Sequence, residues 1–172
     1  SELKEITLPA SVVSVGDSAF SWCESLERAD FSATALKTLP NHCFEMSRKL
    51  SEVRLPDSLE AIGEHAFDMC KEIRSIDIPA GVKTIGSNAF AHCDGITSIV
   101  VPDGVEELSE GVFCDCNALE SITLPEGLKR IGDAAFRGCV MQKLNLPESL
   151  ESIGWEAFSG CAQLSYLELG PN

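Results

Sequence analysis

The feature that most constrains this chain is an internal repeat of 23 residues. Six segments, which begin at residues 3, 50, 73, 96, 119 and 141, follow the pattern L-x-x-I-x-L-P-x-x-L-x-x-I-G-x-x-A-F-x-x-C-x-x. Such a repeat indicates stacked units, because a single unit cannot bury its apolar face alone. We expect one array over residues 1–172, with seven full copies and a partial eighth that begins at Leu164.

Two copies deviate from this length. The copy that begins at Leu26 has an extra residue in FSATAL, lacks the usual Pro and carries Ser47 in place of Cys. Its local register is therefore left open. The copy that ends at Val140 is one residue short. Because the chain starts inside one copy and stops early in another, we expect it to be part of a longer protein.

Each part of the unit predicts a local structure. The L-x-x-I-x-L segment alternates apolar and polar residues, as in Ile122 and Leu124 beside Ser121 and Thr123, which is typical of a strand with one buried face. The Pro that follows ends the strand, since it cannot donate a ladder hydrogen bond. Gly then permits a sharp turn, and A-F-x-x-C fits about one helical turn.

These motifs resemble the BspA-type, or treponemal-class, leucine-rich repeat family. The resemblance rests on L-x-x-I-x-L-P, I-G-x-x-A-F and the closing Cys, and it covers nearly the whole chain. It implies an α/β repeat protein: a right-handed solenoid with a parallel sheet on its concave face and short helical turns on its convex face. It also implies a protein of the cell surface or a secreted protein, used for adhesion and protein recognition.

Composition excludes two classes of partner. The formal charge is −14, from 27 acidic and 13 basic residues, whereas nucleic-acid binding depends on Lys and Arg. No apolar run approaches the roughly 18 residues of a membrane span, and the start, SELKEITLPA, has no signal-peptide core. We therefore expect no nucleic-acid binding and no membrane insertion in this segment.

The cysteines follow the repeat instead of forming a disulfide framework. One repeat position holds Cys23, Cys70, Cys93, Cys116, Cys139 and Cys161. Equivalent side chains in stacked layers point the same way about 5 Å apart, while a disulfide needs converging Cβ atoms about 3.8 Å apart. We predict a buried column whose thiols bond nearby carbonyl oxygens, with Ser47 as its one hydroxyl. Cys43 is expected to be buried, and Cys114 to face solvent and react with thiol reagents.

No catalytic, cofactor or metal site is predicted. His92 stands beside Cys93, but other copies place Trp, Met, Asp or Gly at the position of His92, so we interpret it as a surface residue. His42 and His65 are equivalent in adjacent copies and could approach a metal ion with Glu64; a convex-surface coincidence is the simpler interpretation. Nucleotide-binding, serine-hydrolase and zinc-protease motifs do not occur.

The exposed strand positions form two columns along the predicted concave face, and these are the candidate partner-binding residues. The candidates are Arg54, Ser75, Asp77, Ser98, Val100, Ser121, Thr123, Lys143, Asn145 and Tyr166. The columns are charged at their ends and nearly neutral in the middle. The alternative is that they are merely soluble strand residues. Trp22 and Trp155 lie at variable convex positions, either as single exposed aromatics or as a contact patch.

The sequence therefore predicts a non-catalytic recognition and adhesion scaffold that binds a protein through its concave face, with a glycan as the other ligand class. The alternative is a purely structural spacer in a multidomain protein whose function lies elsewhere. Solenoids need polar caps, and neither Ser1-Glu2 nor Gly170-Pro171-Asn172 supplies one. We expect partly exposed terminal layers that can associate end to end.

Overall fold

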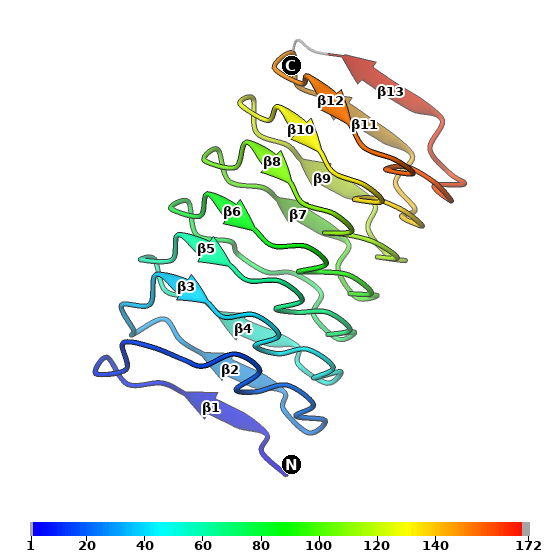
Figure 1. Ribbon diagram of the computed structural model, residues 1–172. Helices are drawn as coiled ribbons and strands as arrows, with labels where there is room; N and C mark the ends of the chain where they lie inside the picture. The colour runs from blue at the N-terminus through cyan, green and yellow to red at the C-terminus, as the bar shows by residue number, and fades with distance from the viewer. Residues whose placement is uncertain (1, 170–172) are drawn as a thin grey trace.

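The computed structural model describes residues 2–169 as a solenoid whose coils form two stacks of parallel strands (Figure 1). The first stack, called the concave sheet here, contains β1 (Glu5–Thr7), β2 (Arg28–Asp30), β4 (Glu52–Arg54), β7 (Ser98–Val100), β9 (Ser121–Thr123), β11 (Lys143–Leu146) and β13 (Tyr166–Leu169). The second sheet contains β3 (Thr38–Leu39), β5 (Ala61–Ile62), β6 (Thr84–Ile85), β8 (Glu107–Leu108), β10 (Arg130–Ile131) and β12 (Ser152–Ile153). The predicted repeat fold is thus confirmed.

The concave sheet keeps the repeat register through the longer copy that begins at Leu26. β2 pairs residue for residue with β1 and β4, so that Glu5, Arg28 and Glu52 stand side by side. The extra residue of this copy is taken up after the strand. There the backbone N–H and the hydroxyl of Ser32 both donate to Asp30 Oδ1, at 3.0 and 2.6 Å.

The concave sheet is interrupted at two places. The strand expected at residues 75–77 is not formed, so β4 and β7 are not linked through it. β9 and β11 belong to neighbouring coils but are not paired. This second gap lies at the end of the short copy. The turn from Cys139 to Met141 has one residue fewer than the equivalent turns, which shifts β11 relative to β9.

The repeated Gly allows close approach of successive coils. A Cβ atom on Gly63, Gly86 or Gly132 would lie 2.5–2.6 Å from backbone atoms of the preceding coil. None of these three glycines has a positive φ, so they are not required for the sharp turn that the sequence suggested. Where Ser109 replaces this Gly, β8 does not pair with β6, and the Ser109 hydroxyl instead donates to the Ile85 carbonyl at 2.6 Å.

The convex segments also differ from the expected fold: residues 2–169 contain no helix, and hence none able to cross a membrane. Each A-F-x-x-C segment has left-handed residues just before its Ala and just before its Cys, such as His65 and Met69. Left-handed residues cannot continue a right-handed helix. Alternate N–H groups donate instead to the next coil, as from Phe67 to Ala89 O at 2.8 Å. The convex face is therefore a hydrogen-bonded ladder of turns.

A column of phenylalanine rings fills the core behind this ladder. Rings one coil apart stack with centroids 5.1–5.8 Å apart, in the order Phe20, Phe44, Phe67, Phe90, Phe113, Phe136 and Phe158. Buried Leu, Ile and Val from both sheets pack against them. The coils are consequently locked to one another by stacking as well as by hydrogen bonds.

Candidate functional site

The cysteine column is structural and mostly as predicted, although Cys161 is only partly buried and, among residues 2–169, no carbonyl oxygen accepts from the Cys23 thiol. The thiols of Cys70, Cys93, Cys116, Cys139 and Cys161 each donate to the carbonyl oxygen of the Phe in the preceding coil, at 3.0–3.2 Å. Ser47 makes the same bond to Phe20 O at 2.7 Å. All eight cysteines are free, and Cys43 is buried.

His92 and Cys93 do not form a reactive pair. The Cys93 thiol is fully buried and bonded to Phe67 O, and burial raises its pKa well above the ordinary value. The His92 side chain is partly exposed, with its Nδ1 atom 3.9 Å from a carboxylate oxygen of Asp115. A protonated, buried thiol is a poor nucleophile, so this pair supports no thiol chemistry.

Cys114 is less exposed than the sequence suggested. Its thiol is half-buried and donates to Asp115 Oδ2 at 3.3 Å, whereas Cys116 points inward. Burial, followed by the hydrogen bond to Asp115 and its charge, raises the pKa of Cys114 to about 11.

Thiol labelling should therefore be slow at the cysteines whose pKa is raised, Cys114 and Cys161 among them. At pH 8, a pKa of about 11 leaves roughly a hundredfold fewer thiolates than the ordinary value of 9.0. We expect iodoacetamide to modify the half-buried Cys114 and Cys161 at least tenfold more slowly than a free thiol, and Cys93 more slowly still. Mass spectrometry of peptides before and after unfolding measures this, with Cys114→Ser as the control. Equal labelling of Cys93 and Cys114 in the folded state would contradict it.

His42 and His65 stack on the convex surface, with ring centroids 5.1 Å apart. Their Nδ1 atoms face the carboxylates three residues later, at 3.2 Å from Glu45 and 3.0 Å from Asp68. Glu45, His65 and Asp68 offer possible metal-ligand atoms within 4.8 Å of one another, and all three are only partly buried. Both histidines are already paired with an acid, which gives the cluster a structural explanation, and the absence of a metal site stays a prediction.

The charged N-terminal part of the concave sheet is internally paired. Arg28 forms an ion pair with Glu5, and Arg54 lies 3.0 Å from Glu52 and 3.7 Å from Asp30. The hydrogen bonds from Ser32 lower the pKa of Asp30. In the free protein these side chains form ion pairs with one another. A partner that bound here would have to break some of these ion pairs.

The middle of the concave sheet is small and uncharged. Pairing of β7 with β9 places Ser98 beside Ser121 and Val100 beside Thr123. Val100 is 63% exposed, unusual for an apolar side chain in the middle of the array. These four residues define the central patch.

The structure leaves all ten candidate residues exposed but does not place them in one continuous sheet. Lys143 and Asn145 stand beside Tyr166 and Glu168 in the β11–β13 pair. Ser75 and Asp77 lie in the coil that forms no strand. The candidates therefore form separate groups along the concave face.

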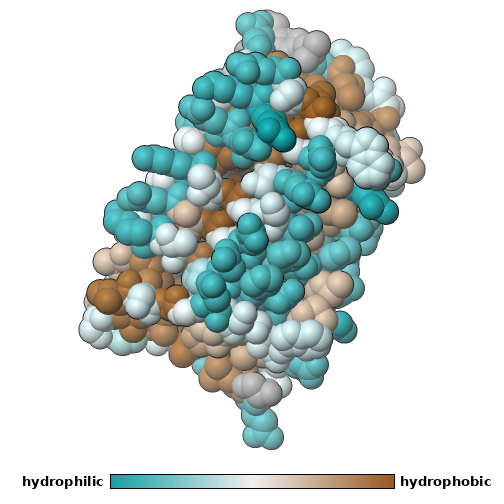
Figure 2. Space-filling model, viewed as in Figure 1, coloured by the Kyte–Doolittle hydropathy of each residue, from teal (hydrophilic) through white to brown (hydrophobic). Residues whose placement is uncertain are grey.

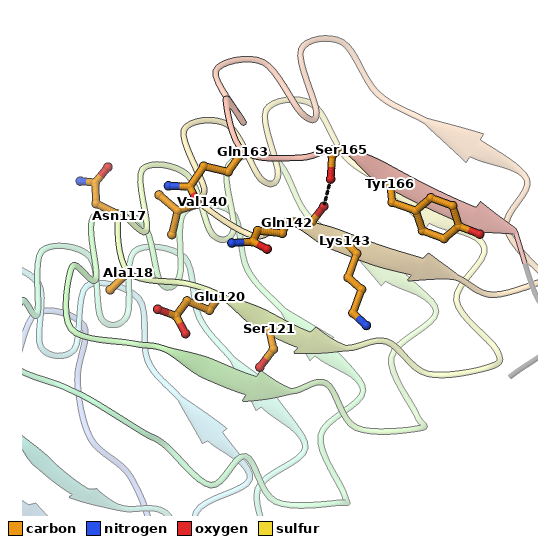
Figure 3. A pocket seen from close by; sticks show the side chains of 10 residues that line it. All are labelled: Asn117, Ala118, Glu120, Ser121, Val140, Gln142, Lys143, Gln163, Ser165 and Tyr166. Atoms are coloured by element: carbon orange, nitrogen blue, oxygen red, sulfur yellow. Dashed lines mark hydrogen bonds between the residues drawn. The ribbon is translucent and has the colours of Figure 1, made fainter.

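Sequence reasoning missed a hollow at the gap between β9 and β11. Its volume is about 800 Å³. Its lining side chains come from three successive coils (Figure 3): Asn117, Ala118, Glu120, Ser121, Val140, Gln142, Lys143, Gln163, Ser165 and Tyr166. We call it the notch. The missing residue before Met141 was the available signal, because a shorter turn leaves space between its longer neighbours.

Apolar side chains are exposed in the first and last described coils. They include Val13 at 77% and Trp155 at 71%, and Trp22 is also exposed. Figure 2 shows apolar surface near both ends of the stack, with largely hydrophilic surface between them. End-to-end association through these coils stays a prediction.

Comparison with known proteins identifies the repeat. A family model described as "BspA type Leucine rich repeat region" matches six copies, over residues 1–120 and 106–172. A leucine-rich cell surface protein of Faecalibacterium prausnitzii is similar in structure, with a TM-score of 0.87 and 28% identity over 96% of this chain and 47% of its own. The leucine-rich repeat protein of T. pallidum has a TM-score of 0.76 and 29% identity over 98% of this chain and 70% of its own. No curated protein matches significantly.

Proposed function

We propose that this chain, which belongs to the BspA-type leucine-rich repeat family, is a non-catalytic recognition module that binds a protein partner through its concave face. The observation that carries the proposal is the central patch of Ser98, Val100, Ser121 and Thr123. It is exposed, uncharged and held in register by backbone pairing. Such a surface can approach a partner without removing charges from water, which is costly for unpaired ions.

The rigidity of the scaffold supports this role. The patch lies on strands backed by the phenylalanine column and the convex ladder, so little ordering should be required on binding. Repeat arrays commonly present extended binding surfaces of this kind. The net charge of −14 favours partners that are not strongly acidic.

We further propose a surface or secreted location. Support comes from the F. prausnitzii relative, which is named as a cell surface protein. This chain spans less than half of that relative's length, 47%, so other segments of a full-length protein could carry the anchor. The alternative function, a spacer that only positions other domains, is favoured by the internal pairing of the N-terminal charges.

The test is a binding screen of the immobilised chain against a panel of extracellular-matrix proteins by biolayer interferometry. The concave variant Val100→Glu/Thr123→Glu places two charges in the central patch. Its matched control, Thr84→Glu/Ser152→Glu, places two charges on exposed strands of the second sheet. We expect at least tenfold weaker binding for the first variant and less than a twofold change for the second. Equal losses, or binding of no protein, would support the spacer instead.

A further inference from the structure

We propose that the notch between β9 and β11 is a binding site for an N-acetylated hexosamine residue. This site shares Ser121 with the central patch, but its ligand does not depend on protein recognition there. The shortened turn Cys139–Met141 opens it, and the two neighbouring turns, at Asn117–Ala118 and Ala162–Gln163, keep their full length. The second sheet continues normally through the same coils, since β10 pairs with both β8 and β12. The gap is therefore a local feature of one edge.

The size and composition of the notch fit a small polar ligand. Its volume of about 800 Å³ lies within the range of roughly 300–1,000 Å³ for small-molecule pockets. Glu120 and Lys143 carry opposite charges, so the lining is neutral overall, in a chain that is otherwise strongly acidic. A neutral ligand suits this balance better than an ion.

The polar side chains that line the notch include two that are already hydrogen-bonded and two that are available to a ligand. Asn117 is held by Asp94, to which its amide donates at 2.8 Å, and Ser165 donates to the backbone carbonyl of Gln142 at 3.2 Å. The carboxamides of Gln142 and Gln163 have no hydrogen-bond partner among residues 2–169. A carboxamide offers a donor and an acceptor side by side, as neighbouring sugar hydroxyls also do.

Apolar groups complete the match to an acetamido sugar. Tyr166 is 52% exposed at one end of the notch (Figure 3), where its ring can cover the C–H face of a pyranose. Ala118 and Val140, at the turn side, can accept the methyl group of an acetamide. Of these features, the small apolar side chains Ala118 and Val140 are the ones that favour an N-acetylated sugar over a plain hexose.

A peptide strand does not fit between β9 and β11. Parts of these two strands approach within 8 Å between Cα atoms. A strand inserted between them would need about 9.6 Å, which is twice the ordinary strand spacing. An added strand is therefore excluded, and a compact ligand would lie over the strand starts, where Ser121 and Lys143 line the notch.

The test is isothermal titration of the 172-residue chain with N-acetylchitotriose, with cellotriose as the matched sugar that lacks the acetamido groups. We expect binding of the first and at least tenfold weaker binding of the second. Equal binding of the two sugars, or binding of neither, would overturn the assignment. Loss of protein binding in the Val100→Glu/Thr123→Glu variant with N-acetylchitotriose binding retained would show that the two sites are separate.

Variants locate the binding. Insertion of Asn between Cys139 and Val140 restores the 23-residue spacing and should fill the notch, which lowers affinity at least tenfold. Tyr166→Ala and Gln142→Ala change exposed side chains only, so they test the site even if the insertion disturbs folding. Each should weaken binding at least fivefold, whereas Arg54→Ala, at the other end of the concave sheet, should leave it unchanged. Unaltered affinity in both exposed-residue variants would place the sugar elsewhere and refute the proposal.

Discussion

Replacing Phe90 by alanine is expected to lower the free energy of unfolding by about 3–5 kcal/mol, the usual loss when a buried aromatic side chain leaves a cavity. Phe90 is fully buried and stacks on Phe67 at 5.1 Å and on Phe113 at 5.7 Å. The hydrogen-bonded ladders hold the neighbouring coils in place, so the cavity cannot collapse fully. Urea unfolding followed by circular dichroism measures the change.

The matched control for this substitution is Phe158→Ala in the last convex segment. Phe158 is only partly buried and, within the described residues 2–169, stacks on Phe136 alone, at 5.5 Å. Phe158→Ala should lower the free energy of unfolding by about 1–2 kcal/mol, because the Phe158 ring removes less apolar surface from water on folding than the Phe90 ring does. If the two substitutions were equally destabilising, or if Phe90→Ala cost less than about 1 kcal/mol, the phenylalanine column would not be the main link between coils.

Replacing Gly86 by alanine should be unusually harmful for the addition of a single methyl group. The new Cβ would lie 2.5 Å from the backbone nitrogen of Glu64 and 2.7 Å from the carbonyl carbon of Gly63. Backbone atoms cannot move aside as a flexible side chain can, so the two coils must separate. We expect a loss of about 2–3 kcal/mol, as in overpacked cores, measured by thermal and urea unfolding.

Gly16 provides the control because it holds the same repeat position with nothing within 4 Å of its added Cβ. Gly16→Ala should change stability by less than about 0.5 kcal/mol, or raise it slightly by restricting the unfolded chain. Hydrogen exchange at the Gly86 amide, which donates to Ile62 O at 2.8 Å, should also accelerate in Gly86→Ala. Equal effects at Gly16 and Gly86 would mean that glycine is required for its backbone conformation.

Much of the fold could be predicted because the same apolar, Gly, Phe and Cys positions recur in every copy of the repeat, with few exceptions. Alternation around Ile122 predicted a strand, and the cysteine column predicted inward thiols; both are present. The convex segments were predicted incorrectly because Ala and Cys at helical spacing also suit successive turns. The choice was decided by left-handed residues such as His65 and Met69, whose conformation lets alternate N–H groups reach the next coil.

The candidate site was less accessible to sequence reasoning. The concave columns could be read from the alternation, since exposed positions recur every second residue. The absence of a strand at residues 75–77 and the notch could not, because both depend on how one coil meets its neighbours. The missing residue in the copy that ends at Val140 indicated where the repeat is irregular. It did not indicate whether the neighbouring strands would pair there or leave a notch.

By itself the sequence determined the stacked architecture, the burial of the Phe and Cys positions and the exposure of the strand columns, because each depends on the periodic placement of apolar side chains within a unit. Only the tertiary structure decided where successive coils pair and where they part. Pairing depends on inter-coil distances, and these respond to single changes such as Ser109 in place of Gly or one residue lost before Met141. The central patch was thus predictable from the periodic sequence, whereas the notch arises from that local spacing.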